Sequence, residues 1–130
     1  MDETEARQMY QEHILDLYQH PHNFGILKDA THHHKGNNPL CGDEVEMQVQ
    51  IHDGKIAQIK FKGKGCAISM AAASLLTDHA KGKTINEIKA LTKDDILAMM
   101  HIPIGPVRIK CALLSLETLH KTLPSKGEQQ

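Results

Sequence analysis

Hydrophobic and polar residues alternate strictly along residues 44–52, and the alternation returns along residues 57–61. A period of two is typical of strands that bury one face, so each run is predicted to be a half-buried strand. Asp53 and Gly54 lie between the two runs and suit a two-residue turn. We therefore expect an antiparallel hairpin over about residues 44–62.

Apolar residues at helical spacing predict helices on both sides of this hairpin. The first helix, of about four turns, is expected to end before Pro21 and has these apolar positions: Tyr10, Ile14, Leu17 and Tyr18. An alanine-rich run over residues 67–80 follows the hairpin and is predicted to be a second helix, which ends at Gly82.

Two capping boxes and one further apolar stripe complete the pattern. Thr84 with Glu87, and Thr92 with Asp95, each predict the start of a short helix. A last helix begins near Val107 or Arg108 and is expected to end before Pro124. Its core stripe is predicted to contain Ile109, Ala112, Leu113, Leu116 and Leu119. One small sheet and four to five helices predict an α+β fold.

The segment between the first helix and the hairpin, about residues 20–39, is predicted to be a loop because it is rich in glycine, asparagine and proline. It carries five histidines, namely His20, His22, His32, His33 and His34. Nothing in the sequence fixes their geometry, so a solvated loop is the favoured interpretation over a metal site.

A length of 130 residues is that of one domain, which we expect over residues 1–124, followed by a disordered tail at 125–130. The formal net charge of −1, without a dense basic run, argues against nucleic acid or an anionic membrane as a partner. The sequence has no apolar run long enough to span a membrane and no signal peptide, so a cytoplasmic protein is expected.

Three cysteines, Cys41, Cys66 and Cys111, carry the candidate chemistry. In a reducing compartment an odd number of cysteines, far apart in sequence, favours free thiolates or metal ligands over disulfides. Cys41 lies in a Gly/Pro loop beside Asp43, and Cys66 lies where the second strand gives way to a helix. Free N–H groups at that helix start favour a thiolate.

Cys111 is expected to point away from the core, because at 100° per residue it lies about 140° from the centre of its helix's apolar stripe. All three cysteines are thus predicted at the ends or exposed faces of elements. We expect them to converge with Asp43 into one metal or iron-sulfur site, although spacings of this length have no short-motif signature.

Several longer motifs resemble the IscU/SufU family, which includes the N-terminal domain of NifU. The resemblance covers nearly the whole chain. The motifs are Tyr18-Gln-His-Pro-His-Asn-Phe-Gly25, Asn38-Pro-Leu-Cys-Gly-Asp43, Phe61-Lys-Gly-Lys-Gly-Cys-Ala-Ile-Ser69, Lys81-Gly-Lys83 and Pro106-Val-Arg-Ile-Lys-Cys-Ala112. In such a family Cys41, Cys66 and Cys111 match the three ligand cysteines, and Asp43 matches the aspartate that modulates the cluster.

The resemblance implies a SufE/IscU-like fold and a scaffold or carrier rather than an enzyme. Such a scaffold assembles a [2Fe-2S] cluster at Cys41, Asp43, Cys66 and Cys111 from iron and from sulfur that a cysteine desulfurase delivers. It then transfers the cluster to apo-proteins. One or more of the three cysteines would accept persulfide sulfur, and a cluster-bound homo-oligomer and a chaperone partner are further expectations. The chaperone-binding proline-rich segment of IscU is echoed only in part, by Gly105-Pro-Val-Arg-Ile109.

Two alternatives stay open at this point. Lys110 stands where IscU scaffolds carry a histidine, and Arg108-Ile-Lys-Cys-Ala112 looks like SufU, a zinc-dependent sulfurtransferase. The chain lacks the insertion between the second and third cysteines that SufU carries. In the SufU interpretation, zinc occupies the site of the cluster, and iron is another candidate occupant. A zinc-stabilised adaptor without sulfur chemistry is the second alternative. The fourth ligand is open among Asp43, Lys110, a loop histidine and water.

Overall fold

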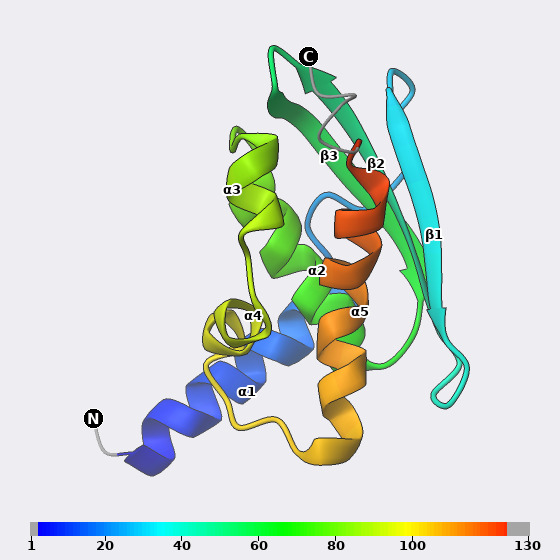
Figure 1. Cartoon of the computed structure of the whole chain (residues 1–130). Helices are drawn as coiled ribbons and strands as arrows, with labels where there is room; N and C mark the ends of the chain where they lie inside the picture. The colour runs from blue at the N-terminus through cyan, green and yellow to red at the C-terminus, as the bar shows by residue number, and fades with distance from the viewer. Residues whose placement is uncertain (1–2, 125–130) are drawn as a thin grey trace.

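The structure, a computed structural model, describes residues 3–124, and the predicted tail at 125–130 lies outside the described residues. The sheet has three strands. Figure 1 shows the helices gathered on one of its faces. The elements in chain order are α1 Glu3–Gln19, β1 His32–Asn38, β2 Asp43–His52, β3 Lys55–Lys64, α2 Ala67–Ala80, α3 Ile85–Lys89, α4 Lys93–Met100 and α5 Pro106–Thr122. The predicted α+β class, with a small antiparallel sheet and four to five helices, is confirmed.

The predicted hairpin is present as β2 and β3, which lie antiparallel with Val49 opposite Ile59. Asp53 and Gly54 connect the two strands, and both have positive φ, 52° and 73°. Two successive positive φ angles define the turn type whose twist matches that of paired strands. A register shift between Gln50 and Ile51 marks a bulge near the end of β2.

Residues 32–38 form strand β1, although the sequence predicted a loop there. β1 pairs antiparallel with β2, which places His34 opposite Met47. Its side chains alternate, so His32 and His34 are half-buried while His33 is exposed. The alternation was missed because β1 contains mostly polar residues, and its pairing with β2, not its own hydrophobicity, makes it a strand.

Helices α2 and α5 cover one face of the sheet, where the inward side chains of β2 and β3 form the core. The largest of these core residues, Phe61, Met47, Ile56 and Ile59, are fully buried. Gly36 lets α5 approach β1, because a Cβ there would lie 2.2 Å from Thr118 Oγ1. Helices α1 and α4 pack on α2 and so form an outer layer.

The opposite face of the sheet is partly covered by the segment that joins α1 to β1. Phe24 forms a bridge with Phe61 in β3, and the chain then reaches β1 at the other edge of the sheet. On the way, the backbone N–H of Leu27 donates to Oε1 of Gln48 at 2.7 Å. Gln48, on the polar face of the predicted hairpin, is therefore buried.

The helix ends follow the predicted capping boxes, which are present at both Thr84 and Thr92. Helix α5 begins at Pro106, one or two residues before the predicted start near Val107 or Arg108, with Gly105 as its N-cap. In α1 only Ile14 and Leu17 of the predicted apolar stripe are buried, while Tyr10 and Tyr18 are exposed. Within residues 3–124 no helix has the length and apolar character needed to cross a membrane.

Candidate metal centre

Cys41 lies in the short turn between β1 and β2. The carbonyl of Asn38 accepts hydrogen bonds from the backbone N–H groups of Cys41 at 3.2 Å and Gly42 at 2.9 Å. Gly42 has a φ of +73°, a left-handed conformation that glycine adopts without strain. This geometry leaves Cys41 exposed in the turn.

Asp43 is the first residue of β2, and it is buried, with 1% of its surface exposed. Its Oδ1 accepts the backbone N–H of Cys66 at 3.0 Å, and its Oδ2 lies 3.8 Å from Cys66 Sγ. Gly65 makes room for this carboxylate, since a Cβ at that position would lie 2.6 Å from Asp43 Oδ1. The aspartate therefore lies where the start of β2, the end of β3 and the start of α2 meet.

Cys66 is the N-cap residue of α2, as expected from its place between strand and helix, and it is half-buried. Its side chain makes no cap hydrogen bond, so the sulfur stays available for other contacts. Cys66 Sγ lies 3.8 Å from Ser69 Oγ, and that hydroxyl donates to the Cys66 carbonyl at 3.1 Å. The first turn of α2 thus holds the thiol against Asp43.

Cys111 corrects a prediction, because it is fully buried rather than turned towards solvent. Helix α5 packs against both the sheet and α2, and the turn that carries Cys41 covers the side of the helix that was expected to be exposed. Cys111 Sγ lies 3.3 Å from Cys41 Sγ. Burial is the largest cause that raises the pKa of the Cys111 thiol, followed by hydrogen bonding with Cys41 and Asp43.

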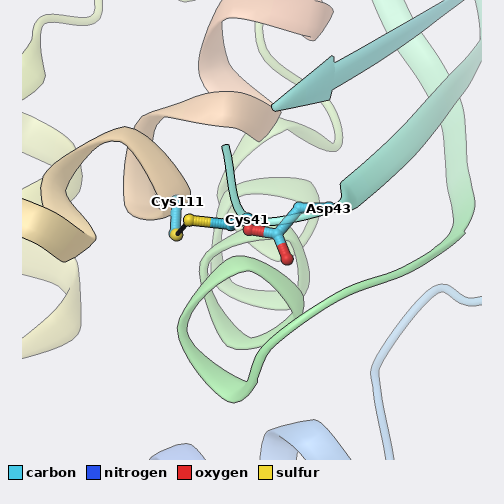
Figure 2. Close-up of side chains that lie close together, drawn as sticks. All are labelled: Cys41, Asp43 and Cys111. Carbon is cyan, nitrogen blue, oxygen red and sulfur yellow. Dashed lines mark hydrogen bonds between the residues drawn. The ribbon is translucent and has the colours of Figure 1, made fainter. Parts of the chain in front are cut away.

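Figure 2 shows Cys41, Asp43 and Cys111 pointing towards one another from a turn, a strand and a helix. One ligand atom from each lies within 4.8 Å of the others. Sulfur ligands of a tetrahedral zinc ion lie ~3.8 Å apart, from Zn–S bonds of ~2.3 Å, so this donor set fits one metal ion after small side-chain shifts. Two thiols and a carboxylate also suit iron.

Of the predicted ligands, Cys66 lies just outside this group of three but contacts Asp43 within it. The structure therefore brings three of the four predicted residues together and places the fourth beside them. Among residues 3–124, no histidine belongs to a comparable group, and Lys110 is exposed on α5. His32, His33 and His34 lie on β1, where alternation places His33 on the face opposite to His32 and His34.

Arg108 is a site residue that the sequence prediction did not include. It lies one helical turn before Cys111 on α5. Interaction with the Cys66 thiol, through hydrogen bonding and then through charge, raises the pKa of the Arg108 guanidinium. The spacing of three residues between Arg108 and Cys111, which puts both on one helix face, is the signal that could have identified it.

Proteins of known family resemble this chain in sequence along most of its length. Residues 9–126 match the family described as NifU-like N terminal domain. The chain belongs to this family. This NifU-like protein is 35% identical to the zinc-dependent sulfurtransferase SufU of Bacillus subtilis, over 87% of its own length and 88% of the relative's. It is also 33% identical to the iron-sulfur cluster assembly scaffold protein IscU of Escherichia coli, over 85% and 88% of the two chains.

Solved structures agree with this assignment. A crystal structure from Fervidobacterium islandicum, titled as an iron-sulfur cluster assembly scaffold protein for the SUF system, superposes with a TM-score of 0.78 at 28% identity. The match covers 92% of this NifU-like protein and 99% of that chain. The N-terminal NifU-like domain from Brucella abortus, at 21% identity and a TM-score of 0.72, shows the same fold. The resemblance inferred from the motifs is therefore confirmed.

Proposed function

We propose that this NifU-like protein is a scaffold on which a [2Fe-2S] cluster is assembled and from which it is passed to apo-proteins. The observation that carries the proposal is the convergence of Cys41, Asp43 and Cys111 within 4.8 Å, with Cys66 in contact with Asp43. The family of IscU scaffolds supports it. All four residues are proposed as cluster ligands.

The mixed ligand set supports a transient cargo rather than a permanent cofactor. Thiolates are soft ligands that iron and sulfide favour, whereas the carboxylate of Asp43 is harder and binds such a cluster less firmly. Asp43 also accepts the Cys66 N–H, so its Oδ1 has a second partner within the protein. Because Asp43 has this hydrogen-bond partner within the protein, its carboxylate can dissociate from the cluster without being left unpaired.

The exposures of the three thiols favour Cys41 as the first sulfur acceptor. Cys41 is exposed on its turn, Cys66 is half-buried and Cys111 is buried. In this step the Cys41 thiolate attacks the terminal sulfur of a persulfide on a cysteine desulfurase. A new S–S bond forms on Cys41, the S–S bond of the desulfurase breaks, and the desulfurase cysteine leaves as a thiolate.

A zinc-dependent sulfurtransferase is the second candidate, and two observations favour it. The B. subtilis relative with that name is 35% identical. The segment Arg108-Ile-Lys-Cys-Ala112 resembles SufU, and its Arg108 has its pKa raised by interaction with the Cys66 thiol. In this alternative, Cys41, Asp43, Cys66 and Cys111 would hold zinc, which would keep the thiols deprotonated. Cys41, on the exposed turn, would leave the metal to accept sulfur.

Anaerobic reconstitution of the purified protein with ferrous iron, cysteine, a cysteine desulfurase and a thiol reductant, which supplies the electrons that convert persulfide sulfur to sulfide, separates these functions. We expect a visible sulfur-to-iron absorption that transfers to an apo-ferredoxin, and loss of this absorption in Cys41→Ser. Retained zinc, no chromophore and a large increase in desulfurase turnover would contradict the scaffold proposal and support the sulfurtransferase. If neither the chromophore nor the increased turnover appears, both proposals are contradicted and the protein is an adaptor without sulfur chemistry.

A further inference from the structure

Asn38 is a buried polar residue beside the metal centre, and neither the predicted ligand set nor the three-residue group includes it. It is the last residue of β1, and only 8% of its surface is exposed. Asn37, its neighbour in sequence, points to the other face of the strand and is exposed. An asparagine side chain is thus exposed at position 37 and buried at position 38.

The main chain and the amide oxygen of Asn38 fix the turn that carries Cys41. Its carbonyl accepts the N–H groups of Cys41 and Gly42, and its Oδ1 accepts the N–H of Leu40 at 3.3 Å. An asparagine that bonds the backbone two residues ahead stabilises a turn in the same way as a backbone hydrogen bond. The position of the Cys41 thiol therefore depends on Asn38.

The amide nitrogen of Asn38 faces the opposite ligand. Its Nδ2 donates towards Cys111 Sγ at a distance of 3.9 Å, across 73 residues of sequence. Cys111 is fully buried, so water does not solvate its sulfur. A side-chain amide is a permanent N–H donor, so it can hydrogen-bond a metal-bound sulfur that no water solvates.

We propose that Asn38 is a positioning residue of the metal centre, which donates its side-chain N–H to the metal-bound sulfur of Cys111 while its oxygens hold the turn of Cys41. One residue thereby helps to set the distance between two ligands, Cys41 in the β1–β2 turn and Cys111 on α5. This inference rests on the proposed function, because it requires a metal or cluster on Cys111. Outer-shell partners of this kind orient ligands and tune the affinity for the metal.

The first test compares Asn38→Leu with Asn37→Leu in the full chain, by zinc competition with a chromogenic chelator. Leucine has nearly the shape of asparagine but can neither donate to sulfur nor bind zinc. We expect Asn38→Leu to weaken zinc binding about 10- to 100-fold and Asn37→Leu to leave the affinity close to that of the parent. Equal affinities for Asn38→Leu and the parent would overturn the proposal.

The second test needs no variant of Asn38 and therefore does not depend on its folding. The parent protein is labelled with ¹⁵N and loaded with ¹¹³Cd, and proton–cadmium couplings are measured by NMR. We expect couplings to the Cβ protons of Cys111 and, through the hydrogen bond, to one side-chain N–H of Asn38, with none on Asn37. A coupling to Cys111 without one to Asn38 would overturn this inference alone. No cysteine coupling at all would overturn the metal site and, with it, both proposals.

Discussion

The carboxylate of Asp43 accepts the backbone N–H of Cys66 at 3.0 Å, so the first residue of β2 caps the start of α2. Cys66 itself provides no side-chain cap to this helix. Asp43 therefore has two roles in one place: it is a candidate ligand, and it binds one of the N–H groups that every helix start leaves without a partner in the helix. Changes at Asp43 should affect both stability and metal chemistry.

Asp43→Ala should destabilise the metal-free protein. Loss of a carboxylate that caps a helix costs about 1 kcal/mol in the free energy of unfolding, because a helix N–H group loses its partner. Urea denaturation of the metal-free variant measures this cost. Glu44→Ala is the matched control, since Glu44 is the next residue on β2 but is exposed. If the two variants are equally stable, Asp43 does not act as a cap.

The same Asp43→Ala variant should hold an assembled cluster longer than the parent. Removal of the harder carboxylate ligand leaves the cluster with thiolates, from which transfer is slower. The measurement is the rate at which the visible absorption moves to an apo-ferredoxin under anaerobic conditions. Glu44→Ala should release its cluster at the parental rate. Equal or faster release from Asp43→Ala would show that Asp43 does not promote transfer.

Gly65→Ala should weaken metal binding while the fold is kept. The added Cβ would lie 2.6 Å from Asp43 Oδ1 and 2.5 Å from Ser69 Oγ, so the carboxylate must move out of its place. A displaced ligand of this type costs on the order of 10-fold or more in zinc affinity, which chelator competition measures.

Gly105→Ala is the control for Gly65→Ala, because a Cβ at Gly105 meets no atom within 4 Å. Gly105 is also placed next to a helix start, as the N-cap of α5. The two substitutions therefore differ mainly in the space around the new methyl group. Similar zinc affinities in both variants would contradict the view that Gly65 makes room for Asp43.

The sequence predicted the elements that have a local signal of their own. Alternation of apolar and polar residues predicted β2 and β3, and two capping boxes predicted the starts of α3 and α4. β1 was missed, because its polar residues are held by pairing with β2 and by the close approach of α5 at Gly36. Such contacts come from residues far away in the chain, and no local pattern encodes them.

For the site, the residue types and the family resemblance together predicted that Cys41, Asp43, Cys66 and Cys111 converge, and the structure groups three of these residues, Cys41, Asp43 and Cys111. The exposure of Cys111 was wrong, because the prediction considered a single apolar stripe on α5, whereas the helix is covered on several sides. Arg108 was missed as a site residue for a related reason. Its spacing from Cys111 placed it on the same helix face, but its interaction with Cys66 joins α5 to the start of α2 and is not visible in either segment alone.

Gly36→Ala should destabilise the protein through a clash between β1 and α5. The new Cβ would lie 2.2 Å from Thr118 Oγ1, so the strand and the helix must separate. Overpacking of this kind costs about 1–3 kcal/mol, measured as a lower midpoint of urea denaturation. Adding Thr118→Ala, which removes that hydroxyl, should recover part of the loss. No recovery in the double variant would mean that another contact limits the space at Gly36.

The capping box of α4 should make stability depend on pH in the acid range. Thr92 donates its backbone N–H to Asp95 Oδ2 at 2.8 Å, and hydrogen bonds from Thr92 hold the pKa of Asp95 below its ordinary value of 3.8. A carboxyl whose pKa is lower in the folded state stabilises that state above pH 3.8, and the contribution is lost as the pH falls through the folded pKa. The box should therefore weaken only under strongly acidic conditions.

Thermal unfolding of Asp95→Asn, compared with the parent from neutral to acidic pH, tests this dependence. The parent should be more stable at neutral pH, and the gap should close as the pH falls below 3.8, because asparagine does not titrate. Metal-free protein is required, since thiolate ligands also take up protons on acidification. Asp94→Asn, the same change one residue earlier in α4, removes an equal charge outside the capping box. A gap for Asp95→Asn that stays constant across the acid range would show that the Asp95 charge does not contribute through the box.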